Sequence, residues 1–525
     1  MGAVAAAMKQ RGFTVTGSDA NVYPPMSDFL RGQGIPIAEG YRAENIPADA
    51  EVVIIGNAIS RGNPEAEAAL ERKLLYQSLP EVLKEIFLRG QRNFVVSGTH
   101  GKTTTSAMLA WLLRQAGRDP GFMIGGLPTN LGCGASFTDS EFTVLEGDEY
   151  DTAFFDKRSK FLHYLPECVV INNIEFDHAD IYASLDEIKL TFRRLLNIVP
   201  RTGMAFINGD DPNCLEVAIG APGPVTTVGF TECCALRINN PDYQPEGCSF
   251  TLGGESYGLR MTGEFNVRNA AMAAAAATFA GLCPAEIRAG LATFTGVARR
   301  QELRGEVNGI KVIDDFAHHP TAIRLAVQSL RQRYPDGRLW ILFEARSNTT
   351  RRAVFQTPLA ESLALADFSI VAAIPDLHKL PVHDRLNPQQ LVEDITRLGG
   401  HGLYLPDRAA IVAQVKDLAR PGDIVAVLSN GASAASSRSC SRPSREAGWH
   451  PPGVKPSGAV FQTGPDSQTP ARRRRASRPV APNAPRISAL GSGTVWIVIA
   501  SLAVELKAAS LRVNTPSMRV NPTQP

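Results

Sequence analysis

The stretch SGTHGKTTTS, residues 97–106, contains a glycine-rich turn followed by a lysine and three threonines. The common phosphate-binding pattern is G-x-x-x-x-G-K-[ST], and Val96 stands where its first glycine would be. The two glycines of the turn still allow backbone N–H groups at the start of a helix to approach an anion. Lys102 would then reach the outer phosphates of a nucleotide, and the Thr103 hydroxyl could ligate Mg²⁺. The alternative is an ordinary strand-to-helix turn with a solvated lysine.

Acidic residues and a histidine follow two further strand-like segments. Glu146 ends the segment TVLE, and Asp177 and His178 follow the segment VVINNI. Carboxyl ends of parallel strands meet at one edge of an open sheet, so these side chains should lie near the lysine loop and supply ligands to Mg²⁺. Taken singly, the acidic residues of EGDEYD, 146–151, fit solvated loop carboxylates better, and His178 fits a structural hydrogen bond. The occurrence of these residues together, in this order along the chain, favours the metal site.

The segments that must position these residues alternate between helix and strand patterns, which predicts an α/β fold. The first segment, to about Arg89, alternates a small-residue helix, a strand over FTVTGSD, a helix near residues 26–33 and a strand over VVIIG. Such a unit normally opens with a strand and a Gly-rich turn, and we expect that strand to be missing here. A second unit runs from the strand FVVSG to the helix NAAMAAAAATFAGL, and a third opens near Gly296. The sequence therefore predicts three α/β domains over 1–89, 90–295 and 296–431.

Charge and composition separate this body from a tail. The 525 residues carry 54 Lys+Arg and 52 Asp+Glu, but 13 of the basic and only 3 of the acidic residues fall in 432–525, which leaves the tail at +10 and the body at −8. Twelve of the 36 prolines also fall there. We expect the tail to be largely disordered, because it cannot bury enough apolar surface to offset its ordering entropy. Its apolar run VWIVIASLAV is too short to span a bilayer.

The cysteines and the first residues of the chain indicate in which cellular compartment the protein resides. The eight cysteines have irregular spacing and no C-x-x-C, which argues against a zinc site or a disulfide scaffold and favours a reducing environment. The opening MGAVAAAMKQ lacks the basic lead of a signal peptide. The sequence therefore predicts a cytoplasmic protein.

Seven segments, in order, resemble the Mur ligase family: GTHGKTTT, VLEGDEYD, INNIEFDHADIY, GEFNVRNAAMAAAA, GVARRQE, DDFAHHPTAI and the closing SNG. The family has the tighter loop without the upstream glycine, so Val96 is compatible with it. The resemblance implies ATP- and Mg²⁺-dependent formation of a peptide bond for the bacterial cell wall through an acyl phosphate. It also implies a Rossmann-like UDP-binding domain lacking its first strand, a P-loop-type central ATPase domain, a Rossmann-like C-terminal domain and a disordered basic tail.

Other segments are similar to one branch of that family: GSDANVYPPMS, GNAISRGNPE, GFMIGGLPTNLG, DTAFFDKRSKFLHY and FEARSNTTRR. This branch joins L-alanyl-γ-D-glutamyl-meso-diaminopimelate, the murein tripeptide, to UDP-N-acetylmuramate in peptidoglycan recycling. The partners implied are these two substrates, with no nucleic acid and no membrane.

The resemblance also implies roles for residues of the ATP site. Lys102 and His178 are expected to be catalytic, and Thr103, Glu146 and His178 are expected to hold Mg²⁺. The residues expected to bind ATP are the loop and three later positions: Gly98, Thr99, His100, Gly101, Lys102, Thr103, Thr104, Asn269, Arg300 and Asp315. A helix N-terminal cap is an equally good explanation of Asn269, and a surface ion pair is the alternative for Arg300.

Substrate contacts are expected in the first and third domains. Ser18, Asp19 and Asn57 match the nucleotide-sugar site, although a carboxylate such as Asp19 is also a common turn residue. His318 is expected to contact substrate, but from the sequence either it or its neighbour His319 could be the functional one and the other a packing residue.

Three arginines of FEARSNTTRR could pair with the carboxylates of the tripeptide, because guanidinium suits a bidentate partner. They are Arg346 and Arg351, with Arg352 beside them. The alternative is a solvated basic turn.

Three other functions are considered. A ligase that adds free L-alanine is disfavoured by FFDKRSKF and FEARSNTTRR. A non-catalytic nucleotide-binding remnant is suggested by the two unusual ends, which a late start codon and a frameshift would explain. Nucleic-acid binding through ARRRRAS ranks last, because no aromatic residues interleave that run.

Overall fold

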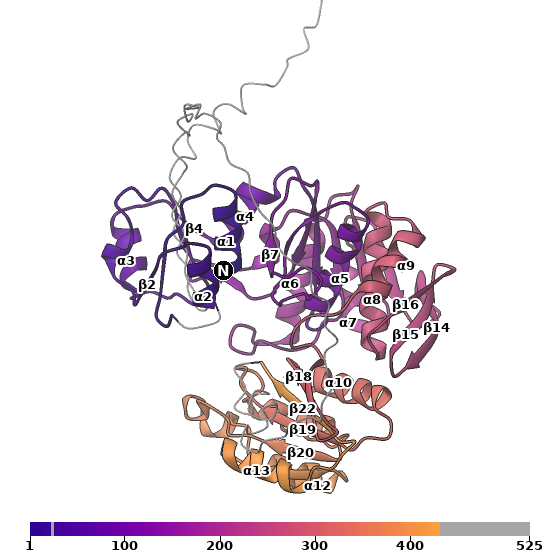
Figure 1. The fold of residues 1–525 in the computed structure, drawn as a ribbon. Helices are drawn as coiled ribbons and strands as arrows, with labels where there is room; N and C mark the ends of the chain where they lie inside the picture. The colour runs from indigo at the N-terminus through magenta and orange to yellow at the C-terminus, as the bar shows by residue number, and fades with distance from the viewer. Residues whose placement is uncertain (23–25, 431–525) are drawn as a thin grey trace, which may run out of the picture.

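The computed structural model describes residues 1–22 and 26–430, which form three units along the chain. Figure 1 shows the central unit in contact with the indigo N-terminal unit and with the orange C-terminal unit. Expectations about residues 432–525 lie outside the described residues. No helix in the described part combines the length and the apolar character that a membrane crossing needs.

The N-terminal unit contains two separate pairs of parallel strands. β1 pairs with β2 and β3 with β4, and within residues 1–22 and 26–91 no strand joins the two pairs. The strand expected over residues 13–19 is formed only by its last three residues. Asn63 caps α3 by accepting from two backbone N–H groups, and Ser78 and Glu81 form a capping box on α4. The elements are α1 (Gly2–Gln10), β1 (Gly17–Asp19), α2 (Met26–Gly32), β2 (Ile37–Glu39), β3 (Val53–Ile55), α3 (Pro64–Glu71), β4 (Tyr76–Ser78) and α4 (Leu79–Leu83).

The central unit is built on a ten-stranded sheet in the order β16-β15-β14-β13-β12-β11-β5-β8-β6-β7. Its strands are β5 (Arg92–Ser97), β6 (Gly121–Met123), β7 (Ala135–Ser136), β8 (Phe142–Glu146), β11 (Pro166–Ile171), β12 (Met204–Asn208), β13 (Val225–Gly229), β14 (Leu236–Gln244), β15 (Gly247–Leu252) and β16 (Glu255–Leu259). The interior strands are parallel, as predicted, and they are buried on both faces. The edges differ from a purely parallel sheet, because β7, β15 and β16 run antiparallel to their neighbours.

Helices cover both faces of this sheet. Apolar residues of α5, α8 and α9 pack in one core with β5, β8 and β16, and those of α6 and α7 pack in another that continues into the N-terminal unit. The alanines of α8 are almost all buried, and their small size lets α8 lie against α5. The helices are α5 (Lys102–Gln115), α6 (Leu185–Asn197), α7 (Pro212–Ala218), α8 (Glu264–Phe279) and α9 (Pro284–Thr293), and a small hairpin is made by β9 (Asp151–Ala153) and β10 (Asp156–Ser159).

The C-terminal unit has a six-stranded sheet in the order β17-β18-β22-β19-β20-β21, parallel except for β17. α10, α11 and α12 pack on one face, and α13 packs on the other against Trp340 and Val425. The elements are β17 (Glu302–Val307), β18 (Ile310–Asp315), α10 (Pro320–Arg333), β19 (Leu339–Glu344), α11 (Gln356–Leu363), β20 (Phe368–Val371), α12 (Pro388–Arg397), β21 (His401–Tyr404), α13 (Arg408–Leu418) and β22 (Ile424–Ser429).

Candidate active site

The lysine loop joins β5 to α5 and is held by the segment that follows the neighbouring strand β11. The Thr99 amide donates to the Asn173 carbonyl at 3.0 Å, and the His100 amide donates to Asn173 Oδ1 at 2.7 Å. Gly98 has φ +123°, and a Cβ there would lie 2.9 Å from the Asn173 carbonyl oxygen. Gly101 has φ +80°, and its Cβ would lie 2.5 Å from Asn269 Oδ1. Only glycine fits at both positions, so the absence of side chains lets the loop pack closely against Asn173 and Asn269.

Lys102, the first residue of α5, forms a buried ion pair. Its Nζ donates to both carboxylate oxygens of Glu149 at 2.9 and 2.8 Å, and to the Gly98 carbonyl at 2.7 Å. Burial disfavours the ammonium charge, but Glu149 and Asp148 outweigh it and raise the pKa of Lys102. Glu149 is 2% exposed. Its pKa is lowered, because Lys102 and His178 together outweigh the burial that would raise it.

His178 completes this cluster from the segment after β11. Its Nε2 lies 2.9 Å from Glu149 Oε1, and its ring packs in a tilted arrangement with its centre 4.3 Å from that of the Tyr150 ring. Burial opposes protonation of the imidazole, but the hydrogen bond to Glu149 more than compensates and raises its pKa. The Tyr182 hydroxyl donates to the Glu149 carbonyl at 2.6 Å and fixes the backbone of that residue. The ammonium group of Lys102, the carboxylate of Glu149 and the imidazole of His178 are therefore linked by consecutive hydrogen bonds.

A pair of oxygen atoms lies at the other side of the loop. Thr103 Oγ1 donates to Glu146 Oε1 at 2.9 Å, and Glu146 Oε2 accepts from the Gly125 amide at 2.7 Å. Arg300, from the segment before β17, donates to the same Thr103 hydroxyl at 3.2 Å. The C-terminal side of the chain thus reaches into the lysine loop.

One cavity of about 250 Å³ lies between the central and C-terminal units and is lined by Lys102, Thr103, Glu146, His178 and Arg300. Apolar residues form one end of it: Met261, Phe265, Ala322, Leu325 and Ala326. Asn269 projects into the same cavity from the interior of α8, five residues after its start, so the cap explanation is wrong; Gly263 is the N-cap of α8. Asn269 is 4% exposed, and its Nδ2 has no hydrogen-bond partner in the described structure. A buried unpaired donor beside an apolar wall suits a flat heteroaromatic ring with an acceptor nitrogen.

The C-terminal unit closes the cavity with the segments around β17 and β18. Arg300 stacks over Phe316, 5.0 Å from the ring centre, so it is not a surface ion pair. Asp315 accepts from the Gln301 amide at 2.8 Å and from the Ala317 amide at 2.7 Å, which holds these two segments together. Burial, only partly countered by Arg300, raises the pKa of Asp315.

The side chains of the adjacent residues His318 and His319 have different surroundings. His318 faces the cavity, and its Nδ1 donates to the Phe316 carbonyl at 2.9 Å. His319 is the residue that caps α10, where its Nδ1 accepts from the Thr321 amide at 3.3 Å. The cavity-facing residue is therefore His318.

The expected nucleotide-sugar residues lie in the N-terminal unit. The Ser18 hydroxyl donates to the buried carboxylate of Glu65 in α3. Asp19 Oδ1 accepts from the Asn21 amide at 3.1 Å, which is the turn role considered for it, and burial raises its pKa. Asn57 is exposed after β3. None of these three residues lines the cavity around Lys102.

The arginines of FEARSNTTRR follow β19 and are engaged locally rather than free in solvent. Arg346 Nε lies 3.0 Å from Glu344 Oε1. Arg351 donates to the Pro375 carbonyl at 3.0 Å, and Arg352 pairs with Asp384. Asn348, in the same loop, donates to Asp180 of the central unit at 3.0 Å. The loop therefore faces the central unit near His178, although the three arginines do not line the cavity.

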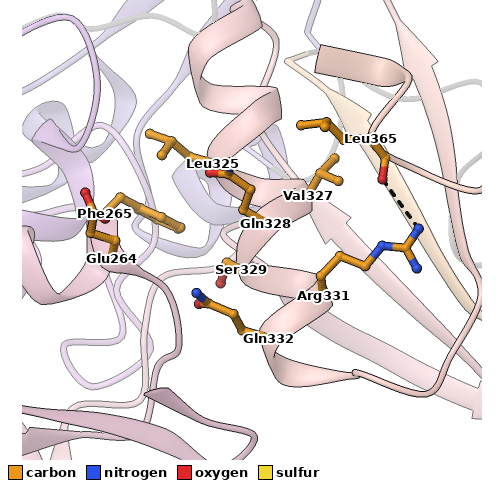
Figure 2. A pocket seen from close by; sticks show the side chains of 9 residues that line it. All are labelled: Glu264, Phe265, Leu325, Val327, Gln328, Ser329, Arg331, Gln332 and Leu365. Atoms are coloured by element: carbon orange, nitrogen blue, oxygen red, sulfur yellow. Dashed lines mark hydrogen bonds between the residues drawn. The ribbon is translucent and has the colours of Figure 1, made fainter. Parts of the chain in front are cut away.

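A larger cavity of about 430 Å³ lies beside the first. Figure 2 shows Glu264 and Phe265, at the start of α8, facing one side of α10, and Arg331 bonded to the Leu365 carbonyl at 3.4 Å. Phe265 and Leu325 line both cavities. None of the residues expected to act on substrate lines this one.

Sequence reasoning left several site residues without a role. Glu149 is one of three acidic residues after Glu146 in EGDEYD that received no role, and only the fold brings it between Lys102 and His178. Asn173 and Phe316 were not singled out, although both belong to predicted strand segments; Asn173 lies two residues after the end of β11 and Phe316 directly after β18, where sheet folds gather ligand-binding groups.

Three stretches of the chain match family profiles. Residues 1–91 match the Mur ligase family catalytic domain, residues 96–277 the Mur ligase middle domain, and residues 299–431 the Mur ligase glutamate ligase domain.

Individual relatives extend these matches over most of the chain. A UDP-N-acetylmuramate–L-alanyl-γ-D-glutamyl-meso-2,6-diaminoheptandioate ligase of Escherichia coli K12 is 41% identical over 439 residues, 82% of this chain and 93% of its own length. A UDP-N-acetylmuramate–L-alanine ligase of Salinibacter ruber is 33% identical over 438 residues, 82% of this chain and 90% of its own length. The crystal structure of a murein peptide ligase from Psychrobacter arcticus, 34% identical, has a TM-score of 0.63 and covers 83% of this chain and 94% of that one.

Proposed function

We propose, from the premise that the chain belongs to the Mur ligase family of ATP-dependent amide-bond ligases, that it joins L-alanyl-γ-D-glutamyl-meso-diaminopimelate to UDP-N-acetylmuramate. The observation that carries this assignment is the 41% identity with a ligase named for those substrates, against 33% with an L-alanine ligase over a similar length. The reaction would return murein tripeptide to peptidoglycan synthesis in the cytoplasm, where ATP is available.

The cavity around Lys102 supports ATP as the nucleotide. The two glycines let the loop turn tightly against Asn173 and Asn269, and a triphosphate at this loop would meet the backbone N–H groups at the start of α5. Asn269 has a buried donor without a partner, and adenine offers ring nitrogens that accept. The apolar residues near Asn269 suit the faces of the base.

The donor set also fits Mg²⁺. Thr103 and Glu146 present two oxygen atoms 2.9 Å apart, and Mg²⁺ prefers oxygen ligands. His178 would serve a second ion through its ring, with Glu149 as the carboxylate that orients the imidazole. When bound, Mg²⁺ would neutralise charge on the phosphate oxygens.

The chain's own residues then have the following roles. The muramate carboxylate attacks the γ-phosphate of ATP, which forms an acyl phosphate and releases ADP; the tripeptide amine then attacks the acyl carbon and displaces phosphate. Lys102 would place its charge on the transferring phosphoryl group, leaving Glu149 partly paired with His178. Arg300 and His318 would approach the same group from the C-terminal unit.

The proposed division of labour follows the three units. Residues 1–89 would hold the UDP-sugar through Ser18, Asp19 and Asn57, residues 90–295 the ATP, and residues 296–431 the peptide. Arg346 and Arg351 would read the carboxylates of the tripeptide, and their loop's contact with Asp180 supports a position near the reacting groups.

The test is a substrate comparison with the purified full chain. We expect ADP release and a new UDP-linked product with tripeptide, and turnover with L-alanine at least a hundredfold slower at equal concentration. Turnover with L-alanine equal to that with tripeptide would contradict the assignment of substrate. ATP binding without any ligated product from either amine would instead support the non-catalytic alternative.

A further inference from the structure

Three side chains that can ligate a metal converge where the lysine loop meets the C-terminal unit. His100 belongs to the loop before α5, Glu175 to the segment after β11, and His319 to the start of α10. His100 Nε2 and His319 Nδ1 lie 3.2 and 3.4 Å from the same atom, Glu175 Oε2. One ligand atom from each residue lies within 4.8 Å of the other two. His100 also lines the ATP cavity, whereas Glu175 and His319 do not, so the cluster adjoins that site through the lysine loop.

The spacing is compatible with a tetrahedral metal. Zinc bonds of about 2.0–2.1 Å to nitrogen and oxygen place neighbouring ligand atoms roughly 3.4 Å apart. The distances of 3.2 and 3.4 Å from Glu175 Oε2 to the two histidine nitrogens are close to this value, and the shorter one also meets the criteria of a hydrogen bond between His100 and Glu175.

The tautomer of His319 also fits a metal site between these residues. Its Nε2 lies 3.3 Å from the Phe176 carbonyl oxygen, which can only accept, so the ring proton belongs on Nε2 and the lone pair on Nδ1 faces Glu175. The Thr321 amide donates to this lone pair at 3.3 Å, so a metal bound at Nδ1 would take the place of that hydrogen bond. Burial first, and the facing His100 second, lower the pKa of His319 to about 3, so the ring is neutral at pH 7. A backbone carbonyl that fixes the outer nitrogen is typical around metal-ligating histidines.

We propose that His100, Glu175 and His319 form a binding site for a divalent transition-metal ion of the zinc class. Two imidazoles and one carboxylate select Zn²⁺, Co²⁺ or Ni²⁺ over the hard Mg²⁺, so this site differs in chemistry from the oxygen pair of Thr103 and Glu146. The ion would tie the phosphate loop to α10 and leave a fourth position for water. The cysteine pattern gives no sign of it, because its ligands come from three separate segments. The proposal does not depend on the ligase assignment, since metal binding is measured without nucleotide or substrate.

The experiment uses the full chain freed of metal with a chelator. Co²⁺ serves as the probe, because tetrahedral Co²⁺ absorbs visible light strongly, and Zn²⁺ affinity is measured by competition with a chromophoric chelator. We expect one equivalent of Co²⁺ in a tetrahedral site without a thiolate charge-transfer band, displaced by Zn²⁺. Glu175→Gln and His319→Gln should each weaken Zn²⁺ binding at least tenfold, whereas His378→Gln, at an exposed histidine outside the cluster, should not change it.

A second measurement protects the test against variants that fail to fold. The unsubstituted chain is labelled at histidine with diethyl pyrocarbonate, with and without Zn²⁺, and the labelled positions are read by mass spectrometry. Zn²⁺ should protect His100 and His319 and leave His378 equally reactive. The proposal is overturned by equal Zn²⁺ affinity in folded Glu175→Gln and His319→Gln chains, by labelling of His100 and His319 that Zn²⁺ does not change, or by a thiolate-type Co²⁺ spectrum.

Discussion

The ammonium group of Lys102 lies 2.8 and 2.9 Å from the two carboxylate oxygens of Glu149. Both side chains are largely buried, and Glu149 has His178 as its second partner. The residue proposed to meet the γ-phosphate therefore already has an anion beside it, so that replacing it also removes a partner of a buried carboxylate.

Replacing Lys102 with methionine should abolish ligation and also destabilise the chain. It removes the charge opposite the phosphoryl group and leaves Glu149 with one partner, at a cost of about 1–3 kcal/mol in the free energy of unfolding. Adding Glu149→Gln should recover stability but not turnover. Activity is measured by ADP release and stability by urea unfolding, with Lys416→Met at an exposed lysine as the control. Near-normal turnover in folded Lys102→Met would remove Lys102 from the mechanism.

His178→Ala should impair ligation most when Mg²⁺ is scarce. The imidazole is the proposed ligand of the second ion, so its loss should raise the Mg²⁺ concentration needed for half-maximal rate by at least about tenfold. The measurement is a Mg²⁺ titration at saturating ATP, with His401→Ala, an exposed histidine, as the control. A lower rate with an unchanged Mg²⁺ requirement would return His178 to a structural role.

Arg346→Ala should raise the KM for tripeptide far more than the KM for ATP. A lost charge-assisted bond to a substrate carboxylate is worth about 1.5 kcal/mol, or roughly tenfold in KM. Arg346 is a cleaner test than Arg351, which also supports the Pro375 carbonyl and so holds its loop. Arg397→Ala, with an exposed guanidinium on α12, is the matched control. Equal changes in both KM values would contradict the proposal that this loop binds the carboxylates of the tripeptide.

Stability should depend on pH through Asp156. Burial would raise its pKa, but Arg158 and then His163 outweigh burial and lower it from 3.8 to about 2. Because the folded pKa is the lower one, the stabilisation is complete above about pH 5 and is lost as the pH falls from about 4 toward 2. Asp156→Asn should therefore cost about 1–2 kcal/mol at pH 7 and progressively less as the pH falls from about 4 toward 2, where the carboxyl of the parent chain is protonated first in the unfolded and then in the folded state.

Urea unfolding at several pH values measures this difference, and Asp139→Asn, at a fully exposed carboxylate, is the control. A gap between Asp156→Asn and the parent chain that stays constant down to pH 3 would show that the carboxylate charge is not what stabilises this hairpin.

The glycine turn, its lysine and the strand-end acids could be predicted because each depends on local sequence. Strand, tight turn and helix follow one another at Gly98 and Gly101, and the interior strands are short apolar runs. Strand β14 at this edge could not be predicted, since its residues are mostly polar and alternate only weakly, whereas Cys248, Phe250 and Leu252 of β15 alternate with more exposed residues in a pattern typical of a strand. The partners of Lys102 and Arg300 come from segments 47 and 197 residues away, so only the assembled fold identifies them. The interior position of Asn269 in α8 likewise depends on where the helix begins.

The hydrogen bond from Arg300 to Thr103 bears on wasteful ATP hydrolysis. Arg300 lies at the junction of the C-terminal unit, stacked on Phe316, and reaches the hydroxyl proposed to hold Mg²⁺. A chain whose peptide-binding unit has swung away would lose this cation together with the His318 side of the cavity. We therefore expect phosphoryl transfer to be slow until the unit that carries the amine is in position, so that ATP is not consumed in cycles that make no amide bond. Cutting the link with Arg300→Ala should therefore slow ADP release and product formation together when all substrates are present, and a rate equal to that of the parent chain would contradict this role.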